Sequence, residues 1–96
     1  MSRKFTDTEL KALNILKDAA ENGDSNDKFS LGNFYFVSSY SLKNVDLLED
    51  AESWFKEAAE NGEEYTRRFY EKFWHKEKQR IREMIIIEIE EEKNDL

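Results

Sequence analysis

The sequence predicts an all-α protein, built as a short array of about four helices that ends in a long C-terminal helix. Three observations lead to this prediction. The chain has no proline and only three glycines among its 96 residues, so little in it would interrupt a helix. One seven-residue stretch occurs twice with a single change, as KDAAENG at 17–23 and KEAAENG at 56–62. Apolar residues around these stretches recur at spacings of three and four, which is the helical period.

The two stretches are 39 residues apart (56 − 17 = 39), and the similarity extends beyond them. When the chain is aligned with itself at this offset, residues 12–23 fall on 51–62 with seven identical positions. The match continues more weakly into the next segment, where Phe34 falls on Phe73. Self-similarity at such a period is typical of helical repeat proteins.

The first helix is expected at 7–22. Thr6 and Glu9 form a capping-box pattern before it, in which a threonine side chain and a glutamate three residues later satisfy free backbone N–H groups. Asn22 and Gly23 end the helix, and we expect Gly23 in the left-handed conformation that commonly follows a helix.

The second helix is expected at 24–38, followed by a loop at 38–45. Asp24 and Asp27 lie in the first turn, where the helix dipole favours negative charge. Gly32 in mid-helix costs about 1 kcal/mol relative to alanine. A close crossing with another helix is the usual compensation.

The third helix is expected at 46–61. It ends at Gly62, as the first helix ends at Gly23. The last helix has no breaker from about 63 to 93, which makes it roughly 45 Å long at 1.5 Å per residue. Since the other helices are about half as long, its C-terminal half is expected to overhang them. The β-branched run leaves a strand at 84–89 as an alternative.

A further motif spans the second and third helices, with the pattern LGxxY and then AxxWFxxAAxxG. Its residues are Leu31, Gly32, Tyr35, Ala51, Trp54, Phe55, Ala58, Ala59 and Gly62. The motif resembles the Sel1-like repeat, a family of the tetratricopeptide superfamily of helix pairs. Length alone predicts one domain, 1–96. The resemblance implies repeats over 7–76, and the last helix is expected to extend beyond them, with an acidic tail, over 77–96. The glycine-containing loop that the family usually has between paired helices is absent at 38–45.

The resemblance implies a non-enzymatic protein–protein interaction module, an adaptor or regulator. Related proteins line a binding groove with the first helix of each pair. The corresponding partner-binding residues here are Lys28, Asn33, Phe36, Arg67, Lys72 and His75.

The distal part of the last helix carries apolar residues for which the repeats offer no obvious cover. These are Ile81, Met84, Ile85 and Ile89. An uncovered apolar surface marks an interface, so we expect them to contact a second copy, as a homodimer, or a protein partner. The alternative is a bend that folds them back onto the chain.

Net charge is −7, yet residues 67–82 hold seven basic and two acidic residues. This basic-aromatic stretch has three interpretations: a helix face that pairs with the acidic first three helices, a contact for an acidic protein, or a nucleic-acid contact. The overall acidity argues against nucleic acid. A second hypothesis for the whole chain is a small acidic inhibitor, of immunity or phage anti-defence type, that blocks a nucleic-acid-binding enzyme.

The chain offers little chemistry. It has no cysteine, and His75 is its only histidine, so we expect no metal site, no cofactor and no catalytic residue. The N-terminus lacks the apolar region of a secretory signal, and no apolar run could span a bilayer. The absence of cysteine is compatible with a reducing compartment, and the expected location is cytoplasmic.

Overall fold

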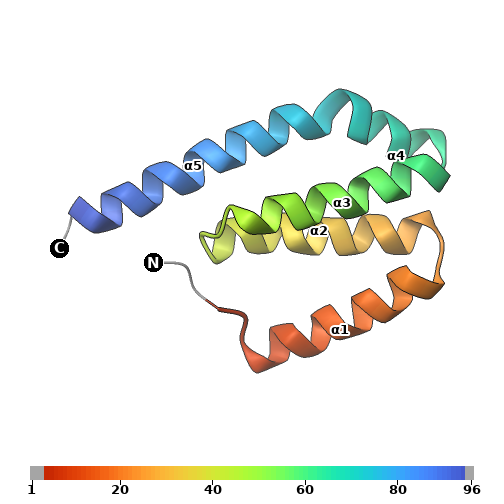
Figure 1. The fold of residues 1–96 in the computed structure, drawn as a ribbon, viewed down its shortest axis with the longest axis horizontal. Coiled ribbons are helices and arrows are strands. Elements are labelled where there is room, and N and C mark those ends of the chain that lie inside the picture. The colour runs from red at the N-terminus through yellow and green to blue at the C-terminus, as the bar shows by residue number, and fades with distance from the viewer. Residues whose placement is uncertain (1–3, 95–96) are drawn as a thin grey trace.

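The structure is a computed structural model that describes residues 4–94. All its elements are helical, so the all-α class with a long C-terminal helix is confirmed (Figure 1). Three helices are separated by short connections, and a fourth continuous helix contains one π-helical segment. The bounds are α1 Asp7–Asn22, α2 Ser25–Ser41, α3 Asp46–Asn61, α4 Glu64–Arg68, η1 Phe69–Trp74 and α5 His75–Asn94.

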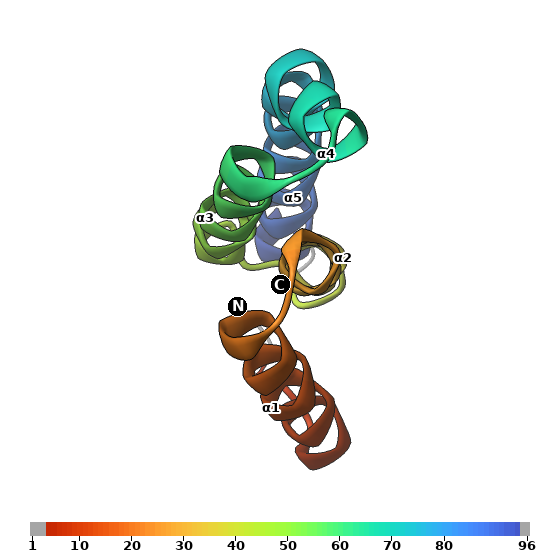
Figure 2. The same ribbon diagram turned by 90° about the vertical axis from the view of Figure 1, so that its right-hand side faces the viewer.

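Each helix runs antiparallel to the one before it (Figure 1). Figure 2 shows α1 at one end of the stack and α4 at the other, with α2 and α3 between them. The predicted bounds of the first and third helices agree with the structure. The second helix begins one residue later and ends three residues later than predicted, which shortens the loop to 42–45. In that loop Lys43 adopts φ 52°, the left-handed conformation that glycine adopts most readily.

The capping box at the start of α1 is confirmed. The backbone N–H of Glu9 donates to Oγ1 of Thr6 at 3.1 Å, and the backbone N–H of Thr6 donates to Oε1 of Glu9 at 2.8 Å. Two backbone donors at the helix start are thereby satisfied.

The predicted left-handed glycines at the helix ends are wrong. Gly23 has φ −108° and Gly62 has φ −106°, both extended. Lack of space is what requires glycine there. A Cβ on Gly23 would lie 2.4 Å from the carbonyl oxygen of Ala19, and one on Gly62 would lie 2.3 Å from that of Ala58. The two helix ends, 39 residues apart, therefore share one local geometry.

Phe55 of α3 lies at the centre of the core. Its ring centroid is 5.1 Å from that of Phe29, 5.0 Å from that of Phe69 and 4.8 Å from that of Trp74. The predicted close helix crossing at Gly32 is confirmed, because a Cβ there would lie 2.8 Å from two ring carbons of Phe55. Aromatic rings from three helices thus meet at one residue.

The π-helical segment explains how the last helix supplies two of these rings. Phe69 and Trp74 are five residues apart, and in an α-helix they would point about 140° apart. The wider turn of η1 places both against Phe55. The helical periodicity of the sequence does not predict this segment.

The expectation that the distal isoleucines lack cover within the chain is wrong. Ile81 and Ile85 are buried in the core, and the alternative strand at 84–89 is helix. Helix α5 runs back along α2 and α3, and only its last turns project beyond the loop that joins them (Figure 1). The hydroxyl of Tyr40 donates to Glu88 at 2.9 Å near this end. Helix length alone could not show that α5 would follow its neighbours.

Met84 and Ile89, the other two residues of that group, are half-buried against the core. The four residues predicted to contact a second copy therefore belong mainly to the interior of the monomer. Residues 95 and 96 of the acidic tail lie outside the described residues. Over residues 4–94, no helix combines the length and the hydropathy needed to cross a membrane.

Candidate functional site

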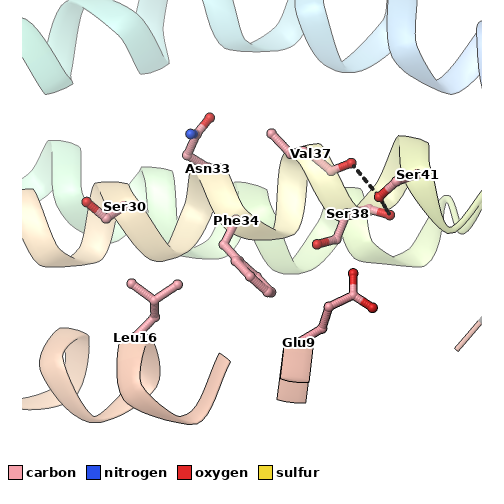
Figure 3. A pocket seen from close by; sticks show the side chains of 8 residues that line it. All are labelled: Glu9, Leu16, Ser30, Asn33, Phe34, Val37, Ser38 and Ser41. Carbon is pink, nitrogen blue, oxygen red and sulfur yellow. Dashed lines mark hydrogen bonds between the residues drawn. The ribbon is translucent and has the colours of Figure 1, made fainter. Parts of the chain in front are cut away.

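The most apolar exposed part of α2 lies beside a hollow between α1 and α2, of about 360 Å³ (Figure 3). Leu16 of α1 and Phe34 of α2 point toward each other across it. Val37 and Asn33 lie on the opposite side of α2 from Phe34. The full lining is Glu9, Leu16, Ser30, Asn33, Phe34, Val37, Ser38 and Ser41. We call this feature the α1–α2 hollow.

The helical period explains why α2 exposes this face. Leu31 and Tyr35 are buried. Asn33 and Val37 each lie two positions from Tyr35 and so point roughly 160–200° away from it. Val37 is therefore 59% exposed. The α1–α2 hollow follows from the use of the other face of α2 for core packing.

A second exposed apolar surface lies on the last helix. Tyr65 is 69% exposed and Phe73 is 55% exposed, and with Arg68 and Phe69 they line a hollow of about 220 Å³. We call these four residues the aromatic patch. Tyr65 also contacts Phe29 of α2, with ring centroids 5.8 Å apart. The aromatic patch therefore adjoins α2.

Of the three partner-binding residues predicted on the second helix, only Asn33 lines the α1–α2 hollow. Lys28 is engaged within the chain. Its Nζ donates to the carbonyl oxygen of Ala20 at 2.9 Å and lies 3.5 Å from Oε1 of Glu57. Phe36 is half-buried, with its ring 5.4 Å from that of Trp74. Lys28 and Phe36 therefore contribute to packing.

The three residues predicted on the last helix are exposed. Arg67 and Lys72 line one shallow, charged hollow of about 260 Å³, and Asn33 does not contribute to it. His75 stands beside Glu52 of α3, with Nδ1 3.8 Å from Oε1. The structure thus brings Arg67 and Lys72 together, but the six predicted residues do not share one surface.

The exposure of Val37, Tyr65 and Phe73 is not among the features predicted from the sequence. Val37 is one of the apolar residues of α2. The sequence signal was its position relative to Tyr35, two residues away, because neighbours at that spacing point in nearly opposite directions on a helix. Phe73 aligns with Phe34 of the repeat, but Phe34 is packed against Phe5 and the core whereas Phe73 is 55% exposed.

Part of the basic-aromatic stretch makes contacts within the chain. Lys78 reaches α3, where its Nζ lies 2.9 Å from Oε1 of Glu49 and 3.2 Å from Oε2 of Glu52. This agrees with the interpretation of the stretch as a helix face that pairs with acidic residues of the first three helices. Phe69 and Trp74 lie in the aromatic cluster around Phe55. No continuous surface for base stacking results.

Glu52 is the electrostatic centre of this contact. Its burial opposes ionisation, but hydrogen bonds from the Trp74 indole and the Lys78 ammonium outweigh this and hold the pKa of Glu52 below its usual value. Burial of Lys78 likewise opposes its charge, and its bonds to Glu49 and Glu52 raise its pKa above the usual value. The cluster is therefore an ion pair at neutral pH, satisfied within the fold.

Residues 4–94 contain no cluster of three or more histidine, aspartate or glutamate side chains that could hold a metal ion. Comparison of the chain with protein-family models, with curated proteins and with solved structures gives no match. The fold and surface define the chain as a small helical protein with an exposed, mostly polar face on α2 that carries Val37. Membership of the Sel1-like family stays a prediction.

Proposed function

We propose that the chain is a non-enzymatic protein-binding module that receives a segment of a partner protein along the exposed face of α2. The observation that carries this proposal is the exposure of Val37 beside the α1–α2 hollow. Full burial of a valine side chain is worth roughly 1.5–3 kcal/mol relative to exposure. Contact of Val37 with an apolar side chain of the partner would therefore contribute to binding.

The chemistry of the α1–α2 hollow defines the partner segment. Its floor, formed by Leu16 and Phe34, suits an aliphatic side chain. Glu9 is the only charged residue in the lining, so a lysine or arginine of the partner is the favourable neighbour. Ser30, Asn33 and Ser41 provide hydrogen-bonding groups at the rim (Figure 3). We propose an amphipathic segment with aliphatic and basic residues.

The test compares three chains as baits: wild type, Val37→Glu and Ile87→Glu. Ile87 is 54% exposed on α5 and does not line the α1–α2 hollow, so its variant controls for a new surface charge outside the hollow. Proteins recovered by wild type are purified and titrated against each bait by calorimetry. The proposal is supported by a partner that binds wild type saturably. Its affinity should fall about tenfold or more with Val37→Glu and should be unchanged with Ile87→Glu.

Equal affinity of wild type and Val37→Glu for every purified partner would overturn the proposal. The acidic-inhibitor hypothesis predicts a different result in the same titrations. The affinity of an acidic inhibitor for its target would come mainly from charge, so that affinity would fall steeply with added salt. Binding through the α1–α2 hollow would depend only weakly on salt, because its lining is mostly uncharged.

A further inference from the structure

One face of α1 has no covering helix. It consists of Thr8, Ala12, Ile15 and Ala19, and we call it the outer face of α1. Ile15 is 70% exposed, the largest value among the exposed large hydrophobic residues of the described chain. α1 uses another face for α2, to which it contributes the buried Leu13 and Ala20. Figure 2 shows α1 at the end of the stack, with α2 as its neighbour.

The equivalent face of α3 shows how this residue pattern packs within the chain. At the 39-residue offset, the outer face of α1 falls on Leu47, Ala51, Trp54 and Ala58 of α3. There Ala51 and Ala58 are completely buried and Leu47 is 8% exposed. Helix α2 packs against α3, and Lys28 of α2 lies 5.8 Å from the Trp54 ring centroid. The same pattern on α3 is therefore covered by a helix, whereas on α1 it is open.

The other end of the stack differs. The exposed side of η1 and α5 carries Lys72, Lys76, Gln79 and Arg82, together with the apolar Phe73, Ile86 and Ile87. A polar outer face is what a terminal unit of a helical array needs for solubility. The exposed side of the last helix thus mixes charged and apolar residues, whereas the outer face of α1 carries no charged residue.

The charges beside the outer face identify its occupant. Lys11 and Asp18 are exposed and seven residues apart, so they lie within about 20° of each other on one edge of that face. Neither has an ion-pair partner among residues 4–94. If a second α1 packs antiparallel with its two-fold axis near Ile15, Lys11 of each copy meets Asp18 of the other. The edge is self-complementary, as an isologous interface requires.

We propose that two copies of this chain associate through the outer face of α1, as an antiparallel helix pair centred on Ile15. The flanking alanines let the two helix backbones approach closely, and Ile15 of each copy is removed from water. The two reciprocal Lys11–Asp18 pairs fix the antiparallel direction. This interface is separate from the α1–α2 hollow and from α5.

The experiment measures molar mass against protein concentration by analytical ultracentrifugation, with circular dichroism of each variant. Wild type is expected to approach twice the monomer mass. Ile15→Glu should weaken the dimer about tenfold or more at unchanged helicity, and Ile87→Glu should leave it unchanged. Lys11→Asp and Asp18→Lys should each weaken the dimer, and the double exchange should restore it.

Restoration by the double exchange is the decisive result, because only an antiparallel contact pairs these two residues. A wild-type chain that stays monomeric at its highest soluble concentration would overturn the proposal. So would a dimer that Ile87→Glu abolishes and Ile15→Glu leaves intact. A dimer weakened by Ile15→Glu but not restored by the double exchange would refute the antiparallel geometry.

Discussion

The indole Nε1–H of Trp74 donates a hydrogen bond to Oε1 of Glu52 at 3.0 Å, and this contact joins η1 to α3. Trp74 is completely buried, so its indole has no access to water. The other carboxylate oxygen of Glu52 lies 3.2 Å from Nζ of Lys78. One carboxylate therefore satisfies a buried donor and neutralises a cation on the neighbouring helix.

This arrangement predicts a pH-dependent contribution to stability. The pKa of Glu52 is lowered in the folded chain, so the unfolded chain binds the proton more tightly. The contribution to the free energy of unfolding is complete above the unfolded pKa of about 4.3. It is lost as the pH falls through the lower folded pKa. Glu52→Gln should cost about 1 kcal/mol at pH 7, and this difference should disappear in acid.

Urea denaturation of wild type and Glu52→Gln at several pH values measures this difference. Glu52→Ala should cost more, about 2 kcal/mol, because the Trp74 indole is left without an acceptor. Glu60→Ala, an exposed change on the same helix, is the matched control. A Glu52→Gln difference that persists at acidic pH would show that the charge of Glu52 contributes nothing.

Gly32 provides a second prediction, because two effects of opposite sign meet there. Gly32→Ala stabilises the helix by about 1 kcal/mol, because alanine has the higher helix propensity. The new Cβ, however, would lie 2.8 Å from the Phe55 ring, and overpacking of this kind costs about 1–3 kcal/mol. We expect net destabilisation by thermal or urea unfolding.

Ser30→Ala, exposed on the same helix, is the control and should be neutral or stabilising. If the Phe55 ring is the obstacle, then Phe55→Leu should reduce the cost of Gly32→Ala in a double-mutant cycle. Additive effects of the two changes would place the strain elsewhere.

The sequence predicts where the helices begin and end well, and which of their residues are exposed poorly, for one physical reason. Capping at Thr6 and the breaks at Gly23 and Gly62 are local, and they determine where the helices begin and end. Gly32 was also read correctly, since an interior glycine in a helix needs a packing reason. Which residues of a helix stay exposed depends on how neighbouring helices lie. Lys28 is an example, because the family resemblance assigns it to a partner whereas the structure engages it with Ala20 and Glu57.

Ile85 and Ile87 show the same limit within one helix. Both belong to a run of isoleucines, yet Ile85 is completely buried and Ile87 is 54% exposed. We predict that Ile85→Ala lowers the free energy of unfolding by about 2–5 kcal/mol, as expected for a fully buried site. Ile87→Ala should cost well under half as much. Urea denaturation of the two variants measures the contrast, and equal costs would contradict the burial of Ile85.

The last prediction concerns η1, whose i→i+5 turn contains one residue more than an α-helical turn would need. Deletion of Lys72, which is exposed, should convert η1 to α-helix and leave the flanking segments in nearly the same relation. Phe69 and Trp74 would then be four residues apart and still face Phe55. The variant should keep most of its stability and its cooperative unfolding.

Deletion of Gln79 is the matched control, because it removes an exposed residue from regular α-helix. It should rotate Ile81 and Ile85 by about 100° relative to Trp74 and so expose them to water. Circular dichroism and urea denaturation should show a folded chain for the first deletion and a severely destabilised one for the second. Equal damage from both would mean that η1 sets the direction of α5 by more than its extra residue. Tolerance of both would mean that α5 can repack in either register, and that the burial of Ile85 is not what holds it against α2 and α3.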